Sequence, residues 1–331
     1  MEEKVEQFLA ALQAERGFSV NTIAAYRNDL QQFIAYLGAP PEEDRIEAVT
    51  AWPDLADPHL NAFLLQLRSR DYAPSTVARK TAALKSFCTF LRKQGDMGTD
   101  IGNNLSSPKV EKYVPKAISH EEVLHLLEQP VRDTPKRPES VRDKAMLEVL
   151  YGTGMRVSEL VALDVEDADL DRGEIRCQGK AGRSRVVPLT PRAIENVRAY
   201  YDEARARLVR DDTTSLFVNH RGGRLTRQGF WLILKSYAER AGIDSITPHT
   251  LRHSYAIHAL RNGAELRDIQ QRLGHVSIGT TQVYRELAAR RDTNPVEIPR
   301  RDGVTDRVTD EKEGATDAMP VIRLQGVSVV D

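Results

Sequence analysis

The sequence predicts a mainly α-helical protein of two domains, with a small β-sheet in the second domain. Its 331 residues exceed the usual size of a single domain. Apolar residues recur at helical spacing along most of the chain, and only two short segments alternate clearly as strands do. The expected parts are an N-terminal domain at 1–107, a linker at 108–117, a second domain at 118–300 and a C-terminal extension at 301–331.

Four helices are expected in the N-terminal domain. The first two carry apolar residues three and four positions apart and end at Gly17 and Gly38. A third helix covers the apolar positions of 60–67. The fourth opens at Ser75, a predicted N-cap, and ends at Gly95.

The second domain is expected to begin with a helix. Ser119 is followed three residues later by a glutamate, a capping box that predicts a helix to about Gln129. Another helix is expected over 138–151. Residues 152–154, Gly-Thr-Gly, then interrupt the chain, and a short helix that bears Arg156 follows.

A hairpin and further helices complete the second domain. Residues 174–178 and 184–189 are the predicted strands, and Lys180 projects from the glycine-containing turn between them. Residues 215–219 are also strand-like. Cap signals predict the remaining helices from Thr190 to about Leu208, from Thr226 to Ala241, from Thr247 to Asn262, up to Gly274, and from Ser277 through Tyr284.

Charge is distributed unevenly, although the net charge is only −1. Residues 61–95 carry seven basic groups against one acid, and residues 172–227 carry thirteen against six. Two such stretches would grip a nucleic-acid duplex from two sides, because phosphate neutralisation supplies most non-specific affinity. Alternatively, the two basic stretches are ordinary solvated surfaces, and the charge distribution alone does not distinguish this interpretation from DNA binding. The candidate DNA contacts are Arg79, Lys80, Lys85, Arg183, Arg185 and Arg227.

The sequence also indicates a compartment. Cys88 and Cys177 are too few and too far apart for a disulfide framework or a zinc pattern, which suits a reducing environment. The N-terminus lacks the features of a signal peptide, and no stretch approaches the roughly 18 apolar residues of a membrane span. We therefore expect a cytoplasmic protein with no membrane partner.

One set of residues points to phosphate chemistry. It supplies a phenol, an ammonium, two guanidiniums and two imidazoles. A phenol has a pKa near 10, so holding it as phenolate at pH 7 costs roughly 4 kcal/mol. Positive charge beside a phosphate offsets this cost and stabilises a five-coordinate phosphorus. The candidate catalytic residues are Arg156, Lys180, His249, Arg252, His275 and Tyr284.

The spacing of these residues fits such a role. His249 and Arg252 lie three positions apart and share one helix face. Lys180, on a hairpin tip, suits a general acid that protonates a leaving 5′ oxygen. Glu159 lies one turn after Arg156 and is expected to orient its guanidinium.

A metal site is the competing interpretation of the histidines. His249 and His253 have the i, i+4 spacing of a zinc motif. However, the glutamate of that motif is missing, and Arg252 lies between the two imidazoles and would repel a cation. We expect no metal and no cofactor.

The ordered set of motifs resembles that of the tyrosine recombinases of the integrase superfamily, most closely the Xer site-specific recombinases. The likeness covers about residues 3–290. It implies a four-helix, SAM-like core-binding domain and a mostly helical catalytic domain with a small β-sheet. The segments that carry the resemblance are 150–160, 179–189, 226–231, 248–253 and 274–284.

The resemblance also implies a role for each candidate residue. Tyr284 would form a 3′-phosphotyrosyl link, while Arg156 and Arg252 hold the scissile phosphate. The two histidines, His249 and His275, would assist by hydrogen bonding and proton transfer. The lysine, Lys180, would protonate the 5′ oxygen, and no ATP or metal would be required.

The biological reaction implied is conservative strand exchange between two short, partly palindromic double-stranded DNA sites. A homo- or hetero-tetramer would carry it out, with a paralogous recombinase or a DNA translocase as further partners, and chromosome-dimer resolution is the expected purpose. An integrase or resolvase of a mobile element and a non-catalytic DNA-binding factor are the alternatives. The chain departs from the family pattern in residues 301–331. The alternatives for this segment are an inert extension, a strand added to the sheet edge of a partner, or a tail that occludes the DNA-binding surface.

Overall fold

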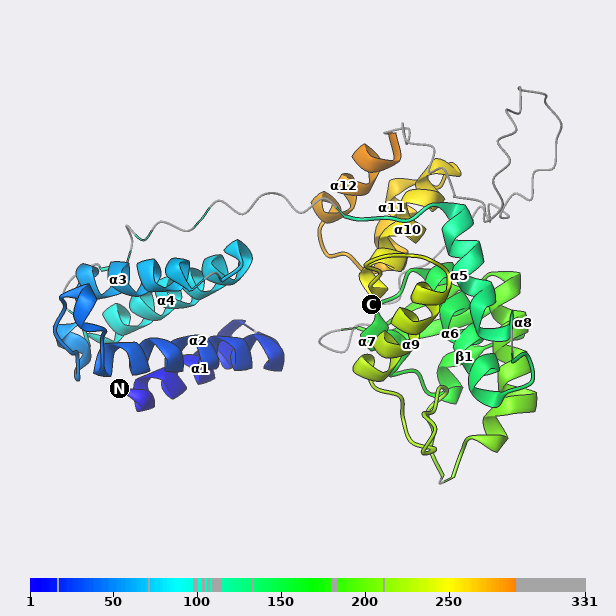
Figure 1. Cartoon of the computed structure of the whole chain (residues 1–331), viewed down its shortest axis with the longest axis horizontal. Coiled ribbons are helices and arrows are strands. Elements are labelled where there is room, and N and C mark those ends of the chain that lie inside the picture. The colour runs from blue at the N-terminus through cyan, green and yellow to red at the C-terminus, as the bar shows by residue number, and fades with distance from the viewer. Residues whose placement is uncertain are drawn as a thin grey trace. The chain divides into compact units, whose positions relative to one another are not determined.

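The computed structural model forms two compact units, Met1–Tyr113 and Val114–Asp331 (Figure 1). The fold class is as predicted: mostly helical, with one small sheet. The residues that the structure describes are 1–16, 18–70, 72–97, 101–102, 105, 108, 115–132, 134–179, 184–210 and 212–289.

The N-terminal unit contains the four predicted helices around an aromatic core. Phe8, Phe33, Phe63 and Phe87 each come from a different helix and are fully buried. The rings of Phe8 and Phe87 lie 5.3 Å apart, and those of Phe33 and Phe63 lie 5.1 Å apart, both tilted, a favourable geometry for aromatic pairs. The helices are α1 (Glu2–Arg16), α2 (Val20–Gly38), α3 (Asp57–Ser69) and α4 (Pro74–Gln94), with short 3₁₀ turns η1 (Glu42–Asp44) and η2 (Trp52–Asp54) between α2 and α3.

The start of α4 differs from the prediction. Its N-cap is Ala73, and Ser75 lies exposed inside the first turn. The reason is Pro74, which is favoured at the first helical position because its φ is already helical and its missing N–H is not needed there. The predicted end of α4 is confirmed, since Gly95 adopts the left-handed conformation with φ 76°.

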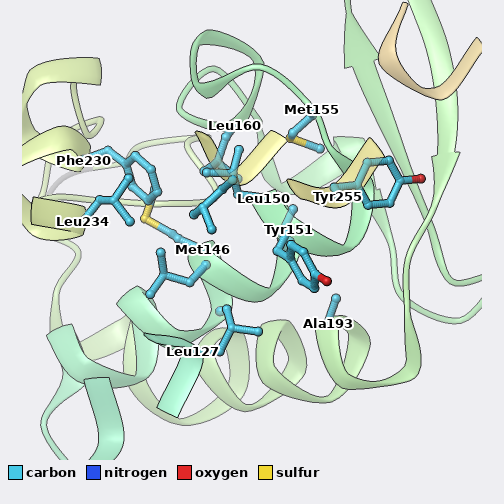
Figure 2. Packing of buried hydrophobic residues seen from close by; sticks show 14 of the residues in the cluster. Leu127, Met146, Leu150, Tyr151, Met155, Leu160, Ala193, Phe230, Leu234 and Tyr255 are labelled. Atoms are coloured by element: carbon cyan, nitrogen blue, oxygen red, sulfur yellow. The ribbon is translucent and has the colours of Figure 1, made fainter. Parts of the chain in front are cut away.

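The C-terminal unit is built around helix α6 (Pro138–Thr153), which is buried on almost every side. It packs against α5 (His120–Arg132), α8 (Pro191–Ala199) and α10 (Pro248–Arg261). Figure 2 shows Met146 and Leu150 of α6 among side chains of α5 and α9 (Arg227–Arg240). This packing fixes the end of α6, from which the candidate site begins.

The sheet is antiparallel with strand order β1-β2-β3. β2 (Glu174–Gln178) pairs with β3 (Ser184–Pro188), with Cys177 opposite Arg185, so the predicted hairpin is confirmed. The two-residue strand β1 (Ala168–Asp169), which follows the 3₁₀ turn η3 (Val165–Asp167), was not predicted. Residues 180–183, with Lys180 and Arg183, lie outside the described residues.

Several predicted boundaries shift. α5 continues to Arg132, past the expected end at Gln129. α6 runs on to Thr153, so the interruption comes only at Gly154. α8 ends at Ala199 and is followed by a π-helical turn, η5 (Tyr200–Ala204), and a 3₁₀ turn, η6 (Arg205–Arg207). The strand expected at 215–219 is reduced to isolated bridges, Asp164 with Ser215 and Val218 with Arg224.

The cap signals before the last helices are confirmed. Side-chain oxygens of Thr226 and Thr247 accept backbone hydrogen bonds at the starts of α9 and α10, because each lies three residues before the donor. α11 (Leu266–Leu273) ends at Gly274, and the Ser277 hydroxyl accepts from the Gly279 N–H at the start of α12 (Ile278–Ala289). None of the helices within the described residues is long and apolar enough to cross a membrane.

Candidate active site

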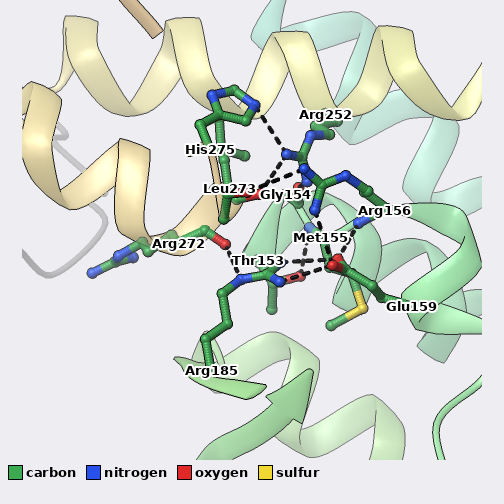
Figure 3. Close-up of polar contacts among 11 residues, drawn as sticks. Thr153, Gly154, Met155, Arg156, Glu159, Arg185, Arg252, Arg272, Leu273 and His275 are labelled. Atoms are coloured by element: carbon green, nitrogen blue, oxygen red, sulfur yellow. Dashed lines mark hydrogen bonds and ion pairs between the residues drawn. The ribbon is translucent and has the colours of Figure 1, made fainter. Parts of the chain in front are cut away.

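The site begins at a turn that only glycine fits. Gly154 ends α6 with φ 63°, and a Cβ there would overlap the ring of Tyr255. The chain therefore reverses sharply, and Arg156 becomes the N-cap residue of the short helix α7 (Val157–Leu160). The Gly154 carbonyl and the Arg156 guanidinium both face the centre of the unit's polar network (Figure 3).

Glu159 binds two arginines within this network. Its Oε2 accepts from the Arg156 backbone N–H at 2.7 Å, and its Oε1 accepts from Arg156 Nη1 at 3.0 Å. Arg185, from β3, donates to both carboxylate oxygens at 2.8 and 2.9 Å. Burial would raise the pKa of Glu159, but the hydrogen bonds from Arg185 and Arg156 and their charges lower it overall. Glu159 is therefore an anion that holds both guanidiniums in place.

Arg252 is the buried cation of the site. The residue is only 4% exposed, and its guanidinium donates to the carbonyls of Gly154 and Leu273, both at 2.6 Å. Arg156 Nη2 donates to the next carbonyl, that of Gly274, at 3.2 Å, so the two guanidiniums lie side by side (Figure 3). Burial and the Arg156 cation lower the pKa of Arg252 to about 10, which still leaves it charged at pH 7.

His275 has a defined tautomer. Its Nε2 lies 3.1 Å from Arg252 Nη2, and a guanidinium can only donate, so Nε2 accepts and carries no proton. Nδ1 therefore carries the proton and lies 3.0 Å from the Thr281 hydroxyl. Burial and the charges of Arg252 and Arg156 lower the pKa of His275 to about 4, which agrees with a neutral ring.

Tyr284, on α12, is buried and bonded to a histidine that the sequence did not single out for catalysis. Its Oη lies 2.7 Å from Nδ1 of His253. The ring of Tyr284 also stacks on that of His275, with centroids 6.2 Å apart. His253 was weighed only as a metal ligand, although its position one turn after His249 places the two imidazoles on the same face of α10.

His249 is the exposed member of the group. Its ring stacks on that of His253 with centroids 6.3 Å apart. Burial of part of the ring, followed by the charges of Arg252 and Arg156, lowers its pKa. The imidazole is thus neutral at pH 7 and accessible to a ligand that approaches the two arginines.

Taken together, the described part of the chain brings five of the six candidate catalytic residues into one region. Lys180 lies outside it. Two neighbouring guanidiniums can hold two oxygens of one phosphate, and three neutral imidazoles and a phenol surround them. Among the described residues no cluster of three or more metal-binding side chains is present.

The candidate DNA contacts differ in how exposed they are and in whether they already bind partners within the protein. Lys80 is buried, and its ammonium binds Asp29 at 2.9 Å; exposed Arg79 also donates to Asp29. Arg185 directs its donors to Glu159 and to the carbonyl of Arg272. Arg227 is exposed at the first position of α9, and Lys85 on α4 is partly buried. Arg183 lies outside the described residues.

Both units match known domain families. Residues 116–291 match the phage integrase family, and residues 5–95 match the phage integrase N-terminal SAM-like domain. The first match alone covers more than half of the chain.

Similar proteins carry recombinase names. The chain is 51% identical over 290 residues to tyrosine recombinase XerC of Roseiflexus castenholzii, which covers 87% of this chain and 90% of the relative. It is 42% identical over 290 residues to tyrosine recombinase XerD of Halalkalibacterium halodurans, covering 87% and 94%.

Solved structures share the fold. The XerH site-specific recombinase bound to a palindromic difH substrate matches with a TM-score of 0.70 at 21% identity, over 87% of this chain and 82% of that one. A λ integrase dimer bound to a core site matches with a TM-score of 0.67 at 17% identity, over 90% and 99%.

Proposed function

The chain belongs to the phage integrase family and is a tyrosine recombinase, and we propose that Tyr284 is the residue with which it cuts and rejoins DNA. The observation that carries this assignment is the position of the Tyr284 phenol. It is stacked on His275, which is itself bonded to the buried cation Arg252. A phosphate held by Arg252 and Arg156 would therefore lie close to the phenol oxygen.

The two arginines would act on the phosphate rather than on the nucleophile. Their guanidiniums neutralise the non-bridging oxygens, and this stabilisation increases when the phosphorus becomes five-coordinate and carries more negative charge. Glu159 keeps Arg156 in its orientation through two hydrogen bonds. Exposed His249 is the imidazole that would donate or accept at the phosphate.

Attack by the Tyr284 oxygen forms a 3′-phosphotyrosyl bond and breaks the bond from phosphorus to the 5′ oxygen. The leaving oxygen requires a proton, and Lys180 is the general acid in this proposal. The reverse reaction with a 5′ hydroxyl from another strand rejoins the DNA. Because the covalent link retains the energy of the phosphodiester, no ATP and no metal enter the scheme.

The proposed substrate is double-stranded DNA with a short, partly palindromic site. Support comes from the relatives at 40–52% identity, which are named XerC and XerD. We propose a tetramer acting in the cytoplasm on two such sites to resolve chromosome dimers, with a paralogous recombinase or a DNA translocase as further partners. Integration or resolution of a mobile element uses the same chemistry and remains the second candidate, because the λ and Tn1549 integrases share the fold.

A nicked suicide substrate tests the role of Tyr284. The parent protein should give a denaturation-resistant adduct with DNA, and Tyr284→Phe should bind the same DNA without forming one. An adduct in the variant, or one that maps to Tyr255, contradicts the assignment. Sequencing the DNA trapped by the parent in cells distinguishes one chromosomal site from the ends of a mobile element.

A further inference from the structure

The nucleophile proposed above is hydrogen-bonded to a histidine outside the set of six catalytic candidates. His253 Nδ1 lies 2.7 Å from Tyr284 Oη, with the rings 5.5 Å apart and tilted at 45°. We propose that His253 is the general base that takes the proton from Tyr284 during attack. The inference rests on the assignment of Tyr284 as the nucleophile.

His275 is the obvious competitor for this role, and its hydrogen bonds argue against it. Its only acceptor nitrogen, Nε2, is engaged by Arg252, and Nδ1 carries a proton. To accept the phenol proton, His275 would have to release Arg252 first. The His275 and Tyr284 ring centroids lie 6.2 Å apart, whereas the phenol oxygen is hydrogen-bonded to His253.

His249 is the second competitor. It is exposed, and its ring stacks on that of His253, with 6.3 Å between the two ring centroids. The hydrogen bond to Tyr284 is made by His253, and His249 is the more exposed of the two rings. This arrangement leaves His249 for the phosphate and His253 for the phenol.

The protonation state of His253 suits an acceptor. Burial, then the neighbouring His249 and the Arg252 cation, lower its pKa to about 4, so the ring is neutral at pH 7. A phenol with a pKa near 10 does not lose its proton to such a ring at rest. The transfer becomes favourable only as negative charge develops on the phosphate beside the imidazole, which couples deprotonation to attack.

The step balances as follows. The step starts from the neutral His253 tautomer that carries its proton on Nε2. The Oη–H bond of Tyr284 breaks, and its proton passes to the unprotonated Nδ1 of His253. The Oη–P bond forms with the electron pair left on oxygen, and the bond from phosphorus to the 5′ oxygen breaks. The leaving oxygen takes a different proton, from the general acid. In rejoining, the His253 imidazolium returns its proton to Tyr284 as the phosphotyrosyl bond breaks.

The alternative is a merely structural role, in which His253 fixes the position of Tyr284. An amide can preserve that hydrogen bond, because its carbonyl oxygen accepts from a phenol but does not become protonated at pH 7. His253→Asn and His253→Gln are therefore the informative variants, and two side-chain lengths guard against failure of one variant to fold. A polyfluorinated tyrosine at position 284 provides the second comparison. Its phenol is far more acidic than that of tyrosine and therefore depends less on a general base.

The experiment measures single-turnover cleavage of a nicked suicide substrate by the full chain, with each nucleophile in the parent and in the His253 variants. With tyrosine, the variants should cleave about 100-fold or more slowly, the range that general bases contribute. With the fluorinated residue the ratio of parent to variant rate should fall to a few-fold. Thermal unfolding and DNA affinity of each variant should match the parent.

Two outcomes overturn the inference. If the variants slow cleavage equally with tyrosine and with the fluorinated residue, His253 only positions Tyr284. If the variants cleave at the parent rate, His253 neither takes the proton nor positions Tyr284. Failure of the proposed function itself is distinct, because the parent adduct would then map to a residue other than 284.

Discussion

The carboxylate of Glu159 and the guanidinium of Arg185 are joined by two parallel hydrogen bonds of 2.8 and 2.9 Å (Figure 3). The pair connects β3 to α7, and Arg185 Nε also donates to the carbonyl of Arg272 at the end of α11. One side chain thereby joins β3 to the segments next to Arg156 and His275. The pair is largely buried, with Glu159 5% and Arg185 17% exposed.

Arg185→Ala should destabilise the C-terminal unit by about 3 kcal/mol, because it leaves a buried carboxylate with one partner fewer. Cleavage should also fall, since Glu159 then loses the contact that positions it for Arg156. Denaturant unfolding and single-turnover cleavage measure the two effects. Arg172→Ala is the matched control. The Arg172 side chain is 80% exposed, so loss of its ion pair with Asp169 should reduce stability by less than about 1 kcal/mol. Equal losses in both variants would contradict the structural role.

The same carboxylate predicts a pH dependence of stability. The pKa of Glu159 is lowered in the folded protein, so its ionised form stabilises the fold above the ordinary glutamate pKa of about 4.3. That contribution is lost as the pH falls through the lowered folded-state value. The difference in unfolding free energy between the parent and Glu159→Gln should therefore be largest near pH 7 and shrink below about pH 4. If the difference in unfolding free energy were constant between pH 7 and pH 3, the negative charge of Glu159 would not be what stabilises the fold.

Gly154→Ala should disrupt the site and the fold together. The substitution imposes a left-handed conformation on alanine, about 1–3 kcal/mol, and its Cβ overlaps the Tyr255 ring. The displaced Gly154 carbonyl would also release Arg252. Gly38→Ala is the control, because nothing lies within 4 Å of its Cβ and alanine favours the helix. We expect unfolding at lower denaturant and loss of cleavage for the first variant only.

Lys180→Ala tests the proposed general acid by the chemistry of the leaving group. The variant should cleave normal DNA slowly with nearly unchanged affinity. A bridging 5′-phosphorothiolate leaves without a proton, so it should restore the rate of Lys180→Ala but not of Arg156→Ala, whose charge acts at the non-bridging oxygens. If the phosphorothiolate substrate is cleaved as poorly as normal DNA by Lys180→Ala, another group supplies the proton.

Much of the fold was predictable because its signals are local. Apolar periodicity located the helices, and the caps at Ser119, Thr226 and Ser277 act within three residues of themselves. Local signals failed where two of them competed. At the start of α4, Pro74 takes the first helical position, so Ser75 lies inside the helix and is not its N-cap. They were also insufficient at η5, where the predicted α-helix changes to a π-helical turn although no glycine or proline lies nearby to mark the change.

By itself, the sequence determined which residue types are available for phosphate chemistry and in which order they occur along the chain. Only the tertiary structure decided which of them meet. His253 and Tyr284 are 31 residues apart, Arg185 and Glu159 are 26 apart, and Lys80 and Asp29 are 51 apart. Such contacts depend on how whole helices pack, and periodicity within one helix carries no information about the partner across the core. For the same reason a basic residue in a charged stretch cannot be assigned to DNA or to a buried carboxylate until its neighbours in space are known.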